Sequence, residues 1–145
     1  MPLGPHVPAW QRLRDALGEL CRQTGAAYAA VLDESNCVWC VWNVSPDNLG
    51  AVVRLYEREV ANLVVPLRRG GRLSVTHIEE SSTDVYLAES FGGLYILALW
   101  FHGPFDPVLP RARVLRALPR IARLTLALPP PDGPDSSSAA GRGRA

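Results

Sequence analysis

Cys37 and Cys40, separated by two residues, form the spacing in this sequence that best matches redox or zinc chemistry. Both chemistries require two sulfur atoms that converge, as they do at a helix N-terminus or in a tight turn. The pair lies instead in the segment 37–42, whose valines and tryptophans predict a strand. Because alternation along a strand sends Cys37 and Cys40 to opposite faces, we interpret both as structural cysteines. A thiol enzyme that uses the pair is the outlying alternative.

Other residue types that could support catalysis do not form a recognisable set. Four carboxylates cluster around one expected hairpin, which is typical of a solvated rim, and three histidines are scattered without ligand spacing. These residues are Glu79, Glu80, Asp84 and Glu89, and His6, His77 and His102. The glycine pairs match no phosphate-binding loop, and no nucleophile motif is present. We therefore expect no enzyme, with no catalytic residue, metal site or cofactor.

Four arginines near the end of the sequence recur at intervals of three, four and three residues, which places them on one side of an expected helix. They are Arg113, Arg116, Arg120 and Arg123. One interpretation is a solvated helix back that happens to be basic; the other is an electrostatic patch for an acidic protein partner. Nucleic acid is not expected as the partner, since no aromatic residues interleave the arginines and the net charge is only +1.

Composition describes one ordinary globular domain. The 145 residues are 48% hydrophobic, and no apolar run approaches the ~18 residues that span a bilayer. The start of the sequence lacks the features of a signal peptide, so we expect a cytoplasmic protein with reduced cysteines. We expect a disordered leader over 1–7, a domain over 8–128, and a disordered tail rich in Pro, Ser, Gly and Ala over 129–145.

Apolar periodicity predicts the order helix, strand, strand, helix, strand, strand, strand, helix. The expected helices cover 8–24, 45–65 and 106–128, and the expected strands cover 26–32, 37–42, 72–79, 84–90 and 94–101. Pro66 is expected to end the second helix, and Pro119 to kink or divide the third. The segment 94–101 is apolar on both faces, as in the middle of a covered sheet. The fold class is therefore α/β (α+β), a five-stranded antiparallel sheet with helices on both faces.

Two surfaces are expected to lie outside the core. In the second helix the predicted core stripe comprises Leu49, Val52, Val53, Tyr56, Val60, Leu63 and Val64. About 180° away lie Ala51, Leu55, Arg58 and Asn62, a mixed set that indicates either a second contact or a half-exposed helix back. In the strand 72–79, Ser74, Thr76 and Ile78 share one face, and the alternation of apolar and polar residues suits an edge strand.

The order of elements over 8–128 resembles the Roadblock/dynein light-chain family, in its bacterial MglB-like form. The stretch Ala27–Asp33 followed by a short return strand is similar to that family's opening hairpin, and Leu94–Phe101 to its central strand. The resemblance implies a profilin/Roadblock-like fold and a homodimer, or a heterodimer with another Roadblock protein, made by the middle helix and the strand after it. Carried onto this sequence, the interface is Ala51, Leu55, Arg58, Asn62, Ser74, Thr76 and Ile78.

The same resemblance implies a function as an adaptor or regulator of a Ras-like small GTPase in bacterial polarity or motility control. The alternative is a GAF-like sensory module or a secretion-chaperone-like binding module, because such domains reuse similar elements.

Overall fold

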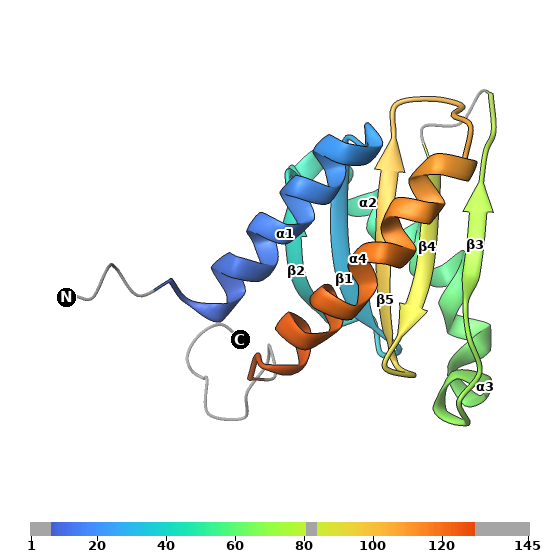
Figure 1. The fold of residues 1–145 in the computed structure, drawn as a ribbon. Coiled ribbons are helices and arrows are strands. Elements are labelled where there is room, and N and C mark those ends of the chain that lie inside the picture. Colours follow the sequence, from blue (N-terminus) through green and yellow to red (C-terminus); the bar gives the residue numbers. More distant parts are fainter. Residues whose placement is uncertain (1–6, 81–83, 130–145) are drawn as a thin grey trace.

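The computed structural model describes residues 7–80 and 84–129, in which one antiparallel sheet lies between two helical layers (Figure 1). Apart from residues 7 and 129, the leader and tail expected from the sequence lie outside the described residues. Within the described ranges, no helix has both the length and the apolar character required to cross a membrane.

The five strands are ordered β2-β1-β5-β4-β3 across the sheet. They are β1 (Tyr28–Asp33), β2 (Val38–Trp42), β3 (Ser74–His77), β4 (Val85–Phe91) and β5 (Tyr95–Phe101). The central position predicted for the segment 94–101 is confirmed, because β5 pairs with β1 on one side and with β4 on the other. All four pairings are antiparallel, and β3, β4 and β5 form a meander.

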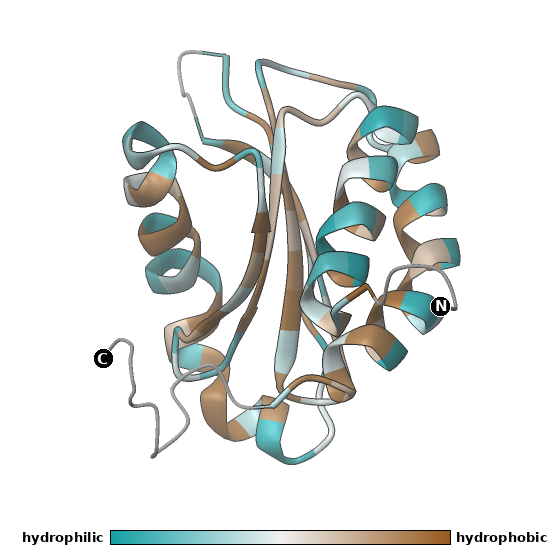
Figure 2. Cartoon of the chain, turned by 90° about the vertical axis from the view of Figure 1, so that its left-hand side faces the viewer, coloured by the Kyte–Doolittle hydropathy of each residue, from teal (hydrophilic) through white to brown (hydrophobic). Residues whose placement is uncertain are grey.

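Helices α1 (Ala9–Thr24) and α4 (Val108–Leu126) pack together on one face of the sheet. α1 ends where the sequence predicts, because Gly25 takes the left-handed conformation (φ 82°) that glycine adopts without penalty. Pro119 does not divide α4, which is a single helix of 19 residues. Both helices turn their hydrophobic sides toward the sheet, as Figure 2 shows with the sheet viewed along its edge.

The opposite face is covered by a segment that is less regular than the single helix expected from the sequence. It comprises a 3₁₀ turn η1 (Pro46–Asn48), helix α2 (Leu49–Leu55), a π turn η2 (Tyr56–Val60), a 3₁₀ turn η3 (Ala61–Leu63) and helix α3 (Val64–Arg68). Pro66 was expected to end the helix but lies inside α3. The backbone breaks at Leu63 (φ −115°, ψ 9°), so Pro66 falls in the first turn of a new helix, where its missing N–H is harmless.

The prediction of which side of this segment faces the core is wrong in its first half. Helical spacing placed Leu49 and Val53 in the core stripe, and Ala51 and Leu55 on the far side. In the structure Ala51 and Leu55 are buried against the sheet, with Leu55 fully inaccessible, whereas Leu49 and Val53 are exposed.

The π turn η2 explains the error. Its wider hydrogen bonding adds about one residue to a turn, which rotates the residues before it by about 100° relative to the residues after it. From the end of η2 onward the predicted phase holds, because Val60, its last residue, is buried while Asn62 is exposed, and Arg58 within the turn is also exposed. A stripe drawn with one helical period cannot be correct on both sides of such a turn.

Candidate interaction site

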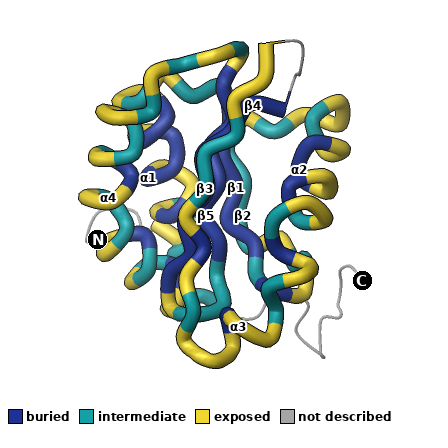
Figure 3. Tube along the Cα trace, turned by 90° about the vertical axis from the view of Figure 1, so that its right-hand side faces the viewer, coloured by how far each residue is buried: buried dark blue, intermediate teal, exposed yellow. Residues whose placement is uncertain are grey.

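Strand β3 forms one edge of the sheet and pairs only with β4 within the described residues (Figure 3). The amide of Ser90 donates to the carbonyl of Leu73 over 2.8 Å, which fixes the register of this pair. Bonded and non-bonded positions alternate along an antiparallel ladder, so Val75 and His77 bond to β4. The backbone groups of Ser74 and Thr76 therefore face away from the sheet and are open to another strand.

The side chains in and just after β3 differ in whether they are available to contact a partner. The hydroxyl of Ser74 donates to Oε2 of Glu89 over 2.6 Å, and the Arg111 guanidinium donates to Ser74 and Thr76. Ile78 follows directly after the strand and is exposed. Ser74 and Thr76 thus offer an open backbone to a partner, but their hydroxyls are already hydrogen-bonded within the domain. Ile78 offers an exposed apolar side chain.

The outward side of the segment 49–68 presents a row of apolar residues. Leu49, Val53 and Val65 are exposed, as are the predicted interface residues Arg58 and Asn62. Ala51 and Leu55 lie beneath this surface and do not reach it. The exposed side of α2 is therefore built from residues that the sequence assigned to the core.

A polar network connects this segment to β4. Arg54 forms a bidentate ion pair with Asp84, with Nη2 to Oδ1 at 3.0 Å. These hydrogen bonds hold the pKa of Asp84 below its ordinary value and raise the pKa of Arg54. The Tyr86 hydroxyl donates to Glu59, and the Arg58 guanidinium lies 5.9 Å from the Tyr86 ring centroid. The network fixes the angle at which α2 and η2 meet the sheet.

Burial raises the pKa of Tyr86, and its hydrogen bond to Glu59 adds to this effect. The ring of His77 stacks on the Tyr86 ring with centroids 5.1 Å apart, and His77 Nε2 lies 3.0 Å from a carboxylate oxygen of Glu79. The aromatic contact connects the edge strand to the network beneath η2. Displacement of η2 would therefore be transmitted to β3.

The arginines of α4 lie on its side facing solvent and α1. Arg113, Arg116 and Arg120 line a hollow of about 480 Å³ between the two helices, together with Glu19 and Gln23. Arg113 donates to the Gln23 carbonyl, while Arg123 is exposed outside the hollow. α1 and α4 together contain eight arginines and two acidic residues, whereas the rest of the described chain contains five arginines and ten acidic residues. The predicted basic side is thus the positive end of a polarised molecule.

Cys21 and Cys40 are unlinked thiols, and Cys37 lies just before β2. β2 begins at Val38, and Trp39 is the extra residue of a bulge opposite β1, so the strand alternation assumed for Cys37 and Cys40 does not hold. Burial raises the pKa of the Cys40 thiol to about 11 and of the Cys21 thiol to about 12, which keeps both protonated at neutral pH. Among the residues that the structure describes, no cluster of three His, Cys, Asp or Glu could hold a metal ion.

Comparison with solved structures gives a consistent result. A structure described as MglB with tetrameric arrangement superposes with a TM-score of 0.64 at 20% identity, covering 84% of this chain and 93% of that one. The gliding protein MglB of Thermus thermophilus gives 0.63 at 20% identity, covering 86% and 96%. The chain has the Roadblock fold of the MglB type. MglC from Myxococcus xanthus also matches, with a TM-score of 0.53 at 14% identity and coverage of 77% and 97%.

No family model and no curated protein sequence matches the chain. The likeness to the MglB-type Roadblock fold is therefore one of structure, and it spans nearly the whole length of the matched chains.

Two carboxylates were misplaced by the sequence interpretation. Asp84 and Glu89 were assigned to a solvated rim, but both are buried and paired with arginines, whereas Glu79 and Glu80 are exposed as expected. The signal for Glu89 was present in the sequence. Glu89 lies on the same face of β4 as Val85, Leu87 and Phe91, at every second residue, and such a position faces the core.

Proposed function

We propose that this chain is a non-catalytic regulator that forms a dimer, with itself or with another Roadblock protein, and binds a Ras-like small GTPase. The observation that supports dimerisation most directly is the β3 edge, which pairs only with β4 within the described residues, and the exposed apolar residues of α2 add to it. Similarity of fold to MglB and MglC supports the same assignment, and one of the matched structures is described as tetrameric.

In the proposed dimer, two β3 strands pair across a two-fold axis through the open backbone of Ser74 and Thr76. This arrangement places the two helical layers that contain α2 side by side on one face of the continuous sheet, and we propose that the exposed Leu49 and Val53 contact the partner there. Burial of apolar area supplies the driving force, and strand pairing supplies the register. Arg58, Asn62 and Ile78 border this contact, while Ala51 and Leu55 support it from beneath.

For the GTPase, we propose that the dimer positions the loops of the bound protein and contributes no catalytic arginine. The basic side of α4, formed by Arg113, Arg116, Arg120 and Arg123, is the proposed contact for an acidic partner. Its charge would act mainly on the rate and orientation of association.

Sedimentation velocity of the full chain tests dimerisation with two matched variants. Val53 and Leu115 are equally exposed, at 43%, but lie on opposite layers. We expect a dimer for the wild type and for Leu115→Arg, and a monomer for Val53→Arg, because the new charge would be buried in the interface. Circular dichroism checks that all three are folded. A monomeric wild type, or a dimer that Val53→Arg leaves intact, would contradict the proposal.

Partner binding is tested separately by size-exclusion chromatography with a Ras-like small GTPase from the same organism, loaded with a non-hydrolysable GTP analogue. Co-elution with the wild type and its loss in an Arg116→Glu/Arg120→Glu variant would support the proposed α4 contact. Absence of a complex with the wild type would argue against GTPase regulation while leaving dimerisation unaffected.

A further inference from the structure

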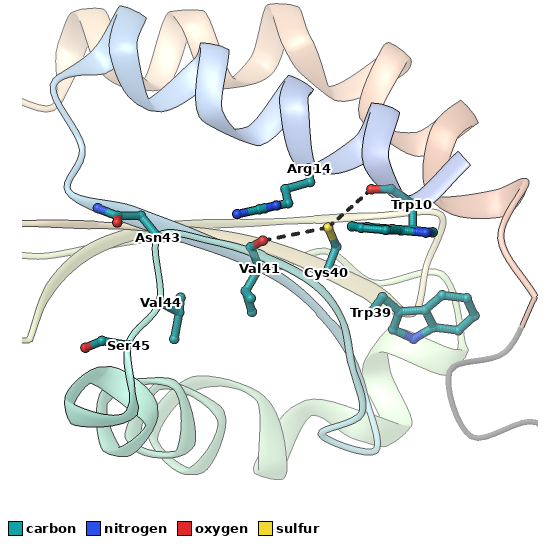
Figure 4. Close-up of a pocket in the computed structure, with 8 residues that line it drawn as sticks. All are labelled: Trp10, Arg14, Trp39, Cys40, Val41, Asn43, Val44 and Ser45. Atoms are coloured by element: carbon teal, nitrogen blue, oxygen red, sulfur yellow. Dashed lines mark hydrogen bonds between the residues drawn. The ribbon is translucent and has the colours of Figure 1, made fainter. Parts of the chain in front are cut away.

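A second hollow lies at the other end of the sheet, between the first turns of α1 and the edge strand β2 (Figure 4). Its volume is about 540 Å³, and its lining includes Trp10 and Arg14 from α1, and Trp39 and Cys40 from β2. Because β2 and β3 are opposite edges of the sheet, this hollow is separate from the proposed dimer contact.

The two aromatic residues of the hollow are anchored differently by the fold, Trp39 through its side chain and Trp10 through its backbone. The Trp39 indole donates its N–H to Asp33 over 2.9 Å, and the ring meets Tyr95 edge-on with centroids 5.3 Å apart. The Cys40 thiol donates to the carbonyl of Trp10 at 3.9 Å, which ties the start of α1 to β2. The Trp10 side chain is nevertheless 51% exposed. A ligand would therefore meet the Trp39 indole, whose position is fixed by these contacts, and the exposed Trp10 indole, whose backbone is tied to β2.

Arg14 adds a positive charge to these walls. Figure 4 shows its side chain extending from α1 over Val41 and Cys40. No carboxylate of the described residues lies within ion-pair distance of it. Indole surfaces bind proline-rich segments in the polyproline II conformation, and a guanidinium binds carboxylates. The chemistry of the hollow thus matches a ligand that offers both proline rings and acidic side chains.

We propose that the hollow binds the chain's own segment 129–135, Pro-Pro-Pro-Asp-Gly-Pro-Asp. A polyproline II helix has three residues per turn, so Pro131 and Pro134 lie on one edge, and Asp132 and Asp135 on the next. The proline edge faces the indoles, and the aspartate edge faces Arg14. The three-residue spacing of the prolines therefore suits the indoles, and the same spacing of the aspartates suits the guanidinium of Arg14.

The start of this segment lies close enough to reach the hollow. α4 runs back along α1, and its C-terminal end lies by the start of α1, near Trp10 and Trp39 (Figures 1 and 4). Leu128, just before the segment, packs against the same core cluster as Trp39. Seven residues in polyproline II conformation extend by roughly 20 Å, so binding within one chain requires no rearrangement of the domain.

Nuclear magnetic resonance of the full chain tests this proposal through its indole N–H signals. We compare the wild type with Pro131→Ser/Pro134→Ser, and with Pro2→Ser/Pro5→Ser as a matched control in the residues before α1. The first variant should shift the Trp10 and Trp39 signals and leave that of the buried Trp100 unchanged, while the second should shift none. Unchanged signals in the first variant, or shifts in the second alone, would overturn the assignment.

A charge exchange provides the second readout. Arg14→Asp should produce the same indole shifts as loss of the prolines, and adding Asp132→Arg/Asp135→Arg to it should restore the wild-type spectrum, whereas Arg116→Asp should have no effect. Failure of the exchange to restore the spectrum would overturn the role of Arg14. The wild-type shifts should also be independent of protein concentration, because a dependence would show that another copy supplies the segment.

Discussion

Arg111 of α4 forms an ion pair with Glu89 of β4, whose carboxylate is buried between the sheet and the helix. The same guanidinium donates to the hydroxyls of Ser74 and Thr76, so one side chain joins α4, β4 and the edge strand β3. Arg72 approaches the other carboxylate oxygen of Glu89 only to 4.0 Å. Arg111 is therefore the main partner of this buried charge.

Replacing Arg111 with methionine should destabilise the fold by about 3–5 kcal/mol, because it leaves the Glu89 carboxylate buried without its partner. The double variant Arg111→Met/Glu89→Gln should recover most of this loss, since the remaining amide is neutral. Urea unfolding, monitored by circular dichroism, measures the unfolding free energy of the single and the double variant. If Arg111→Met were as stable as the wild type, the charge of the Glu89 carboxylate would be compensated by another group.

Stability should fall in acid in a way that depends on Asp84. The hydrogen bonds from Arg54 hold the pKa of Asp84 below its ordinary value of 3.8. A depressed pKa contributes stability that is complete above the ordinary value and is lost as the pH falls through the value in the folded state. We therefore expect Asp84→Asn to flatten the decline of unfolding free energy below about pH 4. Urea unfolding at a series of pH values measures this decline, with the exposed Asp47→Asn as the control. The same decline below about pH 4 in the wild type and in Asp84→Asn would contradict the prediction.

Two glycines in helices should respond oppositely to alanine. A Cβ at Gly18 would lie 2.5 Å from the indole nitrogen of Trp42, so Gly18→Ala must displace that ring and should cost about 1–3 kcal/mol. A Cβ at Gly50 would meet only the flexible end of Arg54, at 3.0 Å. Gly50→Ala should therefore stabilise α2 by up to about 1 kcal/mol. Thermal unfolding distinguishes these outcomes, and a neutral Gly18→Ala would show that Trp42 is free to move.

The thiols of Cys21 and Cys40 should resist alkylation at neutral pH. Burial raises their pKa to about 12 and about 11, so the reactive thiolate is scarce. Mass spectrometry after iodoacetamide treatment should show both unmodified at pH 8 in the folded protein, and modified in urea. A Cys37→Ser/Cys40→Ser variant should form the same oligomer as the wild type, and loss of function in that variant would revive the thiol alternative.

Much of the architecture followed from local signals in the sequence. Gly25 marks the end of α1, and the doubly apolar segment around Leu97 belongs in the middle of the sheet, because only a strand covered on both faces can be apolar throughout. Such signals depend on residues near one another in the chain and on one regular period.

The candidate site was less accessible to this reasoning, because its geometry depends on irregular backbone and distant partners. The π turn at Tyr56–Val60 shifted the helical phase, which exchanged Leu55 with Val53 at the surface. Asp84 and Glu89 became buried because Arg54 and Arg111, 30 and 22 residues away in the chain, neutralise them. The π turn has no signature in the spacing of apolar residues, and the arginine partners cannot be identified from it, although the apolar pattern of β4 does indicate that Glu89 faces the core.

The uneven distribution of arginines between the α1/α4 layer and the rest of the chain gives the molecule a permanent electric dipole. A polyanion that approaches from any direction exerts a torque that turns α4 toward it before the surfaces touch. At physiological salt this reach shrinks to about 8 Å, so the alignment operates only over the last stage of an encounter. The β3 edge of the sheet stays accessible at the same time, because α4 lies on the face of the sheet and not along that edge.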